Sequence, residues 1–257
     1  MITGASSGIG KEFARQLAKK HDLILVARRK NLLEAEANEL KAEFGTSVEV
    51  MQADLSETAD ISMVRDRLIA EDSLGLLVNS AGFGLKGAFW ECSLADHEKM
   101  HRLQINATLA LSHAALGQLI PSNSGGVINV SSVGGFVWFG NVSYGSTKAW
   151  MISFGNGLNV DLKATGSKVK VQTLCPGYTY TNLQEAMGID HRDLAAPSGW
   201  MTSEQVVRSS LEGLSKGKAV VTPGWRNVML AGVMSRLPTG LRISLLAKRQ
   251  AEERNGL

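Results

Sequence analysis

The sequence of 257 residues predicts an α/β protein in which one doubly wound parallel sheet carries helices on both faces. Short continuous apolar runs, such as residues 23–27, alternate along the chain with longer segments of helical periodicity. A glycine-rich turn at residues 3–10 leads directly into one of these helical segments. Neither an internal repeat nor a linker divides the chain, so we expect a single domain.

Composition narrows the class of protein. With 44% hydrophobic and 20% charged residues, the chain has the make-up of a soluble globular domain, and a net charge of +3 is too small to indicate nucleic-acid binding. Cys92 and Cys175 form neither a disulfide framework nor a zinc motif, and the five histidines suggest no metal cluster. Without a signal peptide or a membrane-spanning apolar run, we expect a cytoplasmic protein that binds neither metal nor nucleic acid.

The first expected element is the glycine turn. Glycines at positions 4, 8 and 10 allow a tight turn, close approach of the backbone to a pyrophosphate, and close packing of helix on sheet. The helix expected at 11–20 would direct its free N–H groups at the phosphates. Only Met1 and Ile2 precede the turn, whereas a strand usually has about 5–6 residues. We therefore expect a truncated first strand, with the chain start clipped or misassigned.

The second apolar run, residues 23–27, ends at Ala27 and is followed by Arg28 and Arg29. In dinucleotide-binding folds an acidic residue near this place binds the ribose 2′-hydroxyl of NAD, whereas an arginine accommodates the 2′-phosphate of NADP. The arginine pair therefore predicts NADP(H). The alternative is that both arginines are solvated charges at the start of the next helix.

The rest of the chain continues the alternation up to a last strand near residue 222. Expected strands occupy 48–51, 74–78, 126–130, 169–174 and 219–222, and expected helices occupy 32–44, 93–119, 144–164 and 202–215. The carboxyl ends of parallel strands form the edge at which open α/β sheets bind their ligands. Residues that follow the strands are therefore the first candidates for a site.

Tyr144 and Lys148 are the candidate chemical groups. Residues four apart lie on one face of a helix, a single turn from each other. A phenol has an unperturbed pKa of about 10, and a neighbouring ammonium lowers that pKa, which makes the tyrosine a usable acid and base. The alternative is an ordinary polar helix face. Two serines, Ser131 and Ser132, stand shortly before the tyrosine.

Four motifs in order resemble the short-chain dehydrogenase/reductase family, in its single-domain branch. They are Thr3-Gly4-Ala5-Ser6-Ser7-Gly8-Ile9-Gly10, Asn79-Ser80-Ala81-Gly82, the serine pair, and Tyr144-Gly145-Ser146-Thr147-Lys148. The resemblance extends to about residue 221 and implies a Rossmann-type fold. It implies a catalytic set of Asn106, Ser132, Tyr144 and Lys148, with Ser131 as an alternative to Ser132. It also implies cofactor contacts from Gly4, Ser6, Ser7, Gly8, Ile9, Gly10, Arg28, Arg29, Asp54, Leu55, Asn79, Ala81, Gly82, Tyr144, Lys148, Pro176, Gly177, Thr179 and Thr181.

The activity implied is reduction of a carbonyl by NADPH, with Tyr144 as the proton donor. Lys148 would lower the tyrosine pKa and bind the ribose, Ser132 would bind the substrate oxygen, and Asn106 would hold a water of the proton relay. Aromatic residues beside the motifs make an apolar or acyl-chain ketone plausible, and residues 182–201 have the weak periodicity of a substrate lid. The alternatives are a non-catalytic NADP(H)-sensing protein and a nucleotide-sugar epimerase or dehydratase. The resemblance also implies a homo-oligomer, a dimer or a tetramer.

Residues 223–257 extend beyond the catalytic domain of residues 1–222. Two apolar helical segments are separated by Pro238, and between Arg226 and Arg254 there are six basic and two acidic residues. Basic residues beside apolar faces suit a helix on an anionic membrane surface or over a lipid-like substrate. The alternative, which we favour, is a pair of helices packed on the core or on another subunit.

Overall fold

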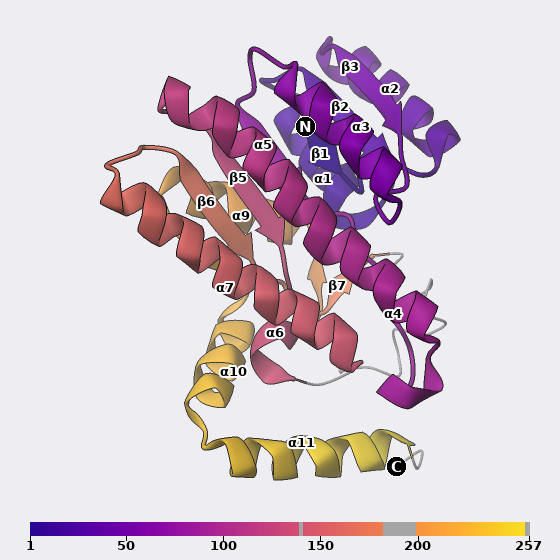
Figure 1. The fold of residues 1–257 in the computed structure, drawn as a ribbon, viewed down its shortest axis with the longest axis vertical. Coiled ribbons are helices and arrows are strands. Elements are labelled where there is room, and N and C mark those ends of the chain that lie inside the picture. The colour runs from indigo at the N-terminus through magenta and orange to yellow at the C-terminus, as the bar shows by residue number, and fades with distance from the viewer. Residues whose placement is uncertain (139–140, 182–198, 255–257) are drawn as a thin grey trace.

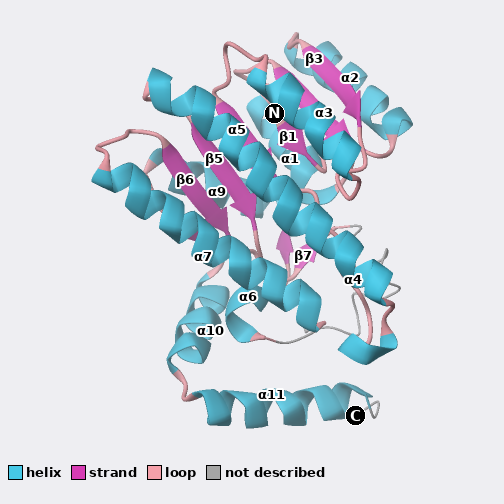
Figure 2. Ribbon diagram, in the orientation of Figure 1, coloured by secondary structure: helices cyan, strands magenta, loops and turns pink. Residues whose placement is uncertain are grey.

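The computed structural model describes residues 1–138, 141–181 and 199–254, and within these ranges it contains one seven-stranded parallel sheet (Figures 1 and 2). The strand order is β3-β2-β1-β4-β5-β6-β9, and each neighbouring pair is parallel. The strands are β1 Ile2–Thr3, β2 Leu23–Ala27, β3 Val48–Gln52, β4 Leu76–Asn79, β5 Gly126–Val130, β6 Lys170–Leu174 and β9 Val220–Val221. The predicted doubly wound sheet is confirmed, and β1 has only two residues.

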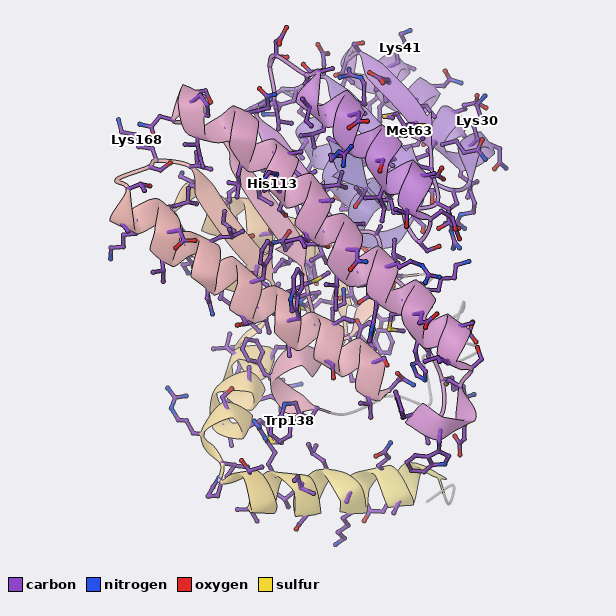
Figure 3. The ribbon with its side chains drawn as sticks, viewed as in Figure 1. Lys30, Lys41, Met63, His113, Trp138 and Lys168 are labelled. Carbon is purple, nitrogen blue, oxygen red and sulfur yellow. The ribbon has the colours of Figure 1, made fainter. Side chains whose placement is uncertain are left out.

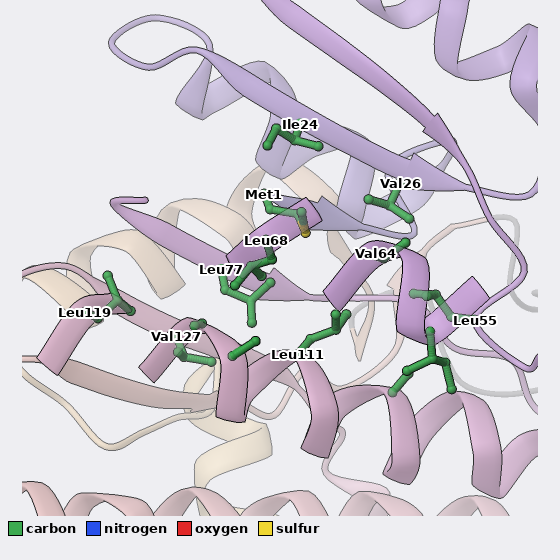
Figure 4. Close-up of a cluster of buried hydrophobic side chains, with 14 of the residues drawn as sticks. Met1, Ile24, Val26, Leu55, Val64, Leu68, Leu77, Leu111, Leu119 and Val127 are labelled. Carbon is green, nitrogen blue, oxygen red and sulfur yellow. The ribbon is translucent and has the colours of Figure 1, made fainter. Parts of the chain in front are cut away.

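Helices cover both faces of the sheet (Figure 1). One layer contains α1 (Gly8–Leu17), α2 (Lys30–Phe44) and α9 (Ser203–Ser215), and the other contains α3 (Thr58–Ile69), α5 (Ala107–Ser122) and α7 (Val142–Ala164). Two apolar clusters form because successive strand residues point to opposite faces. Ile24 and Val26 join the cluster drawn in Figure 4, under α3 and α5, whereas Leu23 and Leu25 join the cluster under α1 and α2.

The long helix expected at 93–119 is interrupted. It consists of α4 (Leu94–His101), a π-helical turn η2 (Arg102–Asn106) and α5. The capping residue expected at its start is confirmed, since the Ser93 side chain accepts a hydrogen bond from the Asp96 N–H at 3.1 Å. A π-helical turn inserts an extra residue into a helix and is frequent at functional sites.

Four short elements were not predicted. They are the 3₁₀ turn η1 (Phe89–Glu91), helix α6 (Gly134–Val137), and the parallel pair β7 (Thr179–Tyr180) and β8 (Met201–Thr202). Most of the expected lid, residues 182–198, lies outside the described residues.

The C-terminal segment forms α10 (Trp225–Arg236) and α11 (Thr239–Arg254), which are separated at Pro238 as predicted. Helix α10 packs on α6, and α11 lies at the margin of the molecule, beyond α6 and α10 (Figure 1). Within the described part of the chain, every helix is too short or too polar to cross a bilayer.

Candidate active site

The glycine turn and the β4 loop form one closely packed unit at the carboxyl edge of the sheet. Gly4 has φ +68°, and a Cβ there would lie 2.9 Å from the Ala81 backbone. A Cβ on Gly10 would collide with the Gly4 carbonyl oxygen. Helix α1 starts at Gly8 with no side-chain cap, so its first N–H groups are available to an anion. Glycine is therefore required at positions 4 and 10 for packing, and the unit fits a dinucleotide pyrophosphate.

Thr3 is a residue to which the sequence analysis gave no role of its own. Its Oγ1 accepts hydrogen bonds from the backbone N–H groups of Ser80 and Ala81, at 3.0 and 3.1 Å. The hydroxyl thereby ties the loop after β4 to the glycine turn. Its position at the start of the glycine motif is the one sequence feature that marks Thr3. That position does not indicate that Thr3 bonds Ser80, 77 residues away.

Three predicted cofactor residues have side chains that face the interior. The Asn79 amide is buried and donates to Asn129 Oδ1 at 2.9 Å and to Ser112 Oγ at 3.2 Å, which joins β4, β5 and α5. Leu55 is in the apolar core (Figure 4), and Ile9 packs against the opposite cluster. The buried side chains of Asn79 and Leu55 leave their backbones as the groups that could contact a cofactor, and the predicted contacts stay predictions.

The predicted adenosine end is open and positively charged. One guanidinium nitrogen of Arg29 donates to Ser6 Oγ and Ser7 Oγ, both at 2.9 Å. Arg28 reaches instead toward Asp54, 3.9 Å away, and Lys99 approaches the same carboxylate at 3.9 Å. Burial opposes ionisation of Asp54, but hydrogen bonds from Ser56 and the charges of Arg28 and Lys99 hold its pKa below the usual value. Arg29 and the two serines thus form a donor group beside the glycine turn.

The end of the site that carries Tyr144 and Lys148 is buried, unlike the end beside Arg28 and Arg29. Helix α7 carries Tyr144 and Lys148 on one face, with the Lys148 ammonium over the Tyr144 ring, 5.5 Å from its centroid. Lys148 is 5% exposed and donates to the Val130 carbonyl at 2.9 Å. Burial lowers the Lys148 pKa to about 8. The predicted pair therefore lies on one turn of α7, at the end of β5.

The expected effect of Lys148 on the phenol is not observed. Burial raises the Tyr144 pKa, and the opposing influence is a hydrogen bond with Ser132. The Lys148 ammonium lies over the ring face and donates one N–H to the Val130 carbonyl, whereas the side chain that hydrogen-bonds the phenol is Ser132. The expected neighbours are present, while burial, which the sequence does not show, raises the pKa of the phenol.

Ser131 and Ser132 have different hydrogen-bond partners. Ser132 hydrogen-bonds Tyr144, and its Oγ accepts from the Gly134 N–H at 3.0 Å. Ser131 is buried and donates to the Lys148 carbonyl at 2.7 Å, which fixes the helix backbone. Ser132 thus meets the phenol, as the first choice predicted, whereas Ser131 is occupied in packing.

The Asn106 side chain is exposed, and its predicted role in a proton relay stays a prediction. Two residues earlier, Gln104 is fully buried and hydrogen-bonds the loop after β4 and helix α7. Residues two apart on a helix point in nearly opposite directions, about 200° apart. Gln104 and Asn106 therefore face different surroundings, although both lie in the π-helical turn.

The loop after β6 completes the site. Pro176 is buried and accepts from the Val133 N–H at 2.9 Å, and a Cβ on Gly177 would collide with Asn227 of α10. The Thr179 hydroxyl donates to the Gly177 carbonyl at 3.0 Å. A Cβ on Gly8 would lie 3.2 Å from Thr181, so this loop passes over the glycine turn. The structure therefore brings together the predicted residues 4–10, 81–82, 132, 144–148 and 176–181.

The comparisons with known proteins agree with this geometry. The family model described as short chain dehydrogenase matches residues 1–191. A short-chain dehydrogenase from Sphingobium yanoikuyae in complex with NADPH is 34% identical with a TM-score of 0.82, over 93% of this chain and 95% of that one. A bulky-bulky ketone specific alcohol dehydrogenase from Comamonas testosteroni is 29% identical with a TM-score of 0.77, over 93% of this chain and 94% of that one.

A curated relative extends the similarity to the C-terminal helices. The very-long-chain 3-oxoacyl-CoA reductase of Anas platyrhynchos is 28% identical, over 96% of this chain and 78% of the relative. The glycine turn, the Tyr144–Lys148 pair and the matched family model lead to one conclusion: the chain belongs to the short-chain dehydrogenase/reductase family and is an oxidoreductase of that family.

Proposed function

We propose that the protein reduces a ketone to an alcohol with NADPH. The observation that carries this proposal is the contact of Ser132, Tyr144 and Lys148 at the closed end of the site, beside the exposed Gly82. A Cβ on Gly82 would lie 3.6 Å from the Lys148 ammonium, so the missing side chain leaves space next to the catalytic groups.

When bound, the nicotinamide supplies the hydride, and the protein supplies position and a proton. Tyr144 hands the proton of its phenol to the carbonyl oxygen as that oxygen gains negative charge. The raised pKa of Tyr144 keeps the phenol protonated at neutral pH, which is the form that a reductase needs. Ser132 donates a hydrogen bond where the charge develops. Lys148 would bind the ribose hydroxyls.

The preference for NADPH is supported by the open end. Arg29 and the hydroxyls of Ser6 and Ser7 form a group of donors suited to a 2′-phosphate, and Arg28 adds a second positive charge nearby. Strand β2 ends at Ala27, so an alanine stands where an acidic residue would hold a free 2′-hydroxyl. The Sphingobium relative is described in complex with NADPH.

An apolar substrate is supported by the residues around Ser132 and Gly82. Phe83 follows the β4 loop, and Phe136, Val137 and Trp138 follow Ser132 on and after helix α6. The relatives from Comamonas and Anas are described as acting on bulky ketones and on long-chain 3-oxoacyl thioesters. We place the substrate of this protein in the same broad class of large apolar carbonyl compounds.

Oxidation of NADPH in the presence of a panel of ketones, 3-oxoacyl thioesters and steroids tests the proposal. We expect turnover with at least one bulky ketone and a lower KM for NADPH than for NADH. Binding of NADPH without turnover of any carbonyl compound would favour the non-catalytic alternative, and a preference for NADH would contradict the cofactor assignment.

A further inference from the structure

Gln104 links the two halves of the site. It lies in the π-helical turn η2, and its side chain is fully buried. The amide nitrogen donates to the Phe83 carbonyl at 2.6 Å, in the loop after β4. The amide oxygen accepts from the Thr147 hydroxyl at 2.8 Å, on α7 between Tyr144 and Lys148. One side chain therefore bonds both the predicted cofactor loop and the catalytic turn.

The geometry leaves little freedom to this link. The Thr147 hydroxyl also lies 2.9 Å from the Tyr144 carbonyl, so its single proton is shared between the amide of Gln104 and the catalytic residue's own backbone. A Cβ on Gly82 would lie 3.6 Å from both Gln104 Nε2 and Lys148 Nζ. Gln104 and Lys148 thus border the same small space from two different helices.

We propose that Gln104 is a positioning residue that holds the loop after β4 in register with the Tyr144–Lys148 turn. The inference rests on the proposed reductase activity. Its physical basis is that both ends of the amide are used, one as donor and one as acceptor, across two elements far apart in sequence. Asparagine is one methylene shorter and could not reach both partners from this position.

Two substitutions test this role. Gln104→Leu removes both hydrogen bonds from a buried position, and we expect kcat to fall about tenfold to a hundredfold with a smaller change in KM for NADPH. Gln104→Glu can donate to the Phe83 carbonyl only when its carboxyl is protonated. Its kcat should therefore fall as pH rises through the pKa of the new carboxyl, whereas wild-type kcat should not show that ionisation.

The controls separate this inference from the proposed function. Leu109→Ala, at an exposed position of the following helix α5, should keep kcat within about twofold of wild type. If the wild type reduces no ketone, the function fails and the role of Gln104 falls with it. If the wild type is active but Gln104→Leu keeps its kcat and Gln104→Glu has the wild-type pH profile, only the positioning role is refuted. Should Gln104→Leu not fold, Thr147→Val removes the same link from the other side and should lower kcat similarly.

A second, independent inference concerns helices α10 and α11. Eight of the twenty large apolar side chains that are exposed in the described chain lie between Trp225 and Leu245. They are Trp225, Val228, Met229, Leu230, Val233, Leu241, Ile243 and Leu245. Among the described side chains of α11, only Arg242 is buried. It donates to the Met234 carbonyl at 3.0 Å and stacks on Trp138, which lies between α6 and α11 in Figure 3.

Helix α11 is thus attached largely through one arginine and has an apolar surface without cover in the described structure. In proteins most of the stability of a helix comes from packing of its apolar face, and the 16 residues of α11 have little of that packing here. Residues 223–257 contain six basic and two acidic residues, while the rest of the chain carries a net charge of −1. A symmetric dimer built on these helices would bring two positively charged segments together, and like charges repel. An anionic surface is the better complement.

We propose that α10 and α11 bind the surface of an anionic phospholipid bilayer. Apolar side chains would enter the interface, and the basic residues would lie near the lipid phosphates. Trp225, 70% exposed at the start of α10, has the amphipathic ring that favours this depth. The proposal does not depend on the reaction that the site performs.

Sedimentation with phospholipid vesicles tests whether α10 and α11 bind a bilayer surface. The full chain should pellet with phosphatidylcholine vesicles that contain phosphatidylserine, pellet less as salt rises, and stay in solution with phosphatidylcholine alone. The triple variant Leu241→Ser, Ile243→Ser and Leu245→Ser should lose binding. Met63→Ser, an equally exposed apolar residue on α3 at the far side of the molecule (Figure 3), should keep it. Wild-type protein that stays in solution with anionic vesicles at low salt overturns the proposal. A triple variant that halves the molar mass and keeps vesicle binding would assign the surface to a second copy instead.

Discussion

The two ends of the site differ in burial, and the difference separates chemistry from recognition. At the catalytic end Lys148 is 5% exposed, and the hydroxyls and amides around it already bond one another. At the adenosine end the Arg28 side chain is 62% exposed, and its nearest acidic partner is 3.9 Å away. A group in a closed, low-dielectric environment interacts strongly, whereas an exposed charge is screened by water. We therefore expect large effects from changes at the closed end and small, cofactor-specific ones at the open end.

Tyr144→Phe should have the largest effect. The substitution removes the proton donor while keeping the ring under Lys148, so kcat should fall by about a hundredfold to ten-thousandfold. Binding of NADPH, followed by fluorescence titration, should change little. A purified variant that retains a substantial part of wild-type kcat would show that Tyr144 is not the acid.

Ser132→Ala should have the next largest effect on kcat, and Ser131→Ala is its matched control. Loss of a hydrogen bond to developing charge costs about a hundredfold to a thousandfold in kcat. Ser131→Ala removes instead the bond to the Lys148 backbone, so it should lower thermal stability with a much smaller effect on kcat. If the two variants exchange these results, the assignment of the serines is reversed.

Lys148→Met should lower kcat and raise stability at neutral pH. Burial lowers the pKa of Lys148 in the folded protein from 10.5 to about 8. Below about pH 8 the buried ammonium therefore lowers the free energy of unfolding by its full amount. The unfolded chain binds the proton more tightly between about pH 8 and 10.5, and the cost is relieved as pH rises through that window. Methionine removes the charge and should stabilise the protein by about 1–3 kcal/mol at pH 7, less at pH 9.5. Urea unfolding at the two pH values measures this, and a destabilised variant at pH 7 would contradict it.

At the open end, Arg29→Ala should raise KM for NADPH about tenfold and leave KM for NADH nearly unchanged, because only NADPH carries the 2′-phosphate. Arg28→Ala should have the smallest effect, about twofold to threefold, since Arg28 lies near Asp54 rather than the serines. Steady-state kinetics with both cofactors compare the two. Equal effects on NADPH and NADH would remove the basis for assigning the cofactor from these arginines.

Local sequence was a good guide wherever spacing and periodicity alone set the outcome. The strands at residues 23–27 and 126–130 were predicted at their observed bounds, because a strand covered on both faces is a short, largely apolar run between polar segments. Tyr144 and Lys148 had to share a face of one helix, because the helical repeat places residues four apart together.

What the sequence determined by itself is therefore the alternating fold, the glycine turn, the Tyr144–Lys148 pair and the break at Pro238, since each depends on neighbours along the chain. The tertiary structure decided which side chains meet. Asn79 and Leu55 turned inward, and Thr3 tied two loops together. Gln104, to which the sequence analysis gave no role, is buried and joins the loop after β4 to α7, because tertiary packing and not periodicity sets its partners. Burial raises the pKa of Tyr144, and the cost of desolvating a phenolate is set by the surrounding fold, which the spacing of Tyr144 and Lys148 does not show.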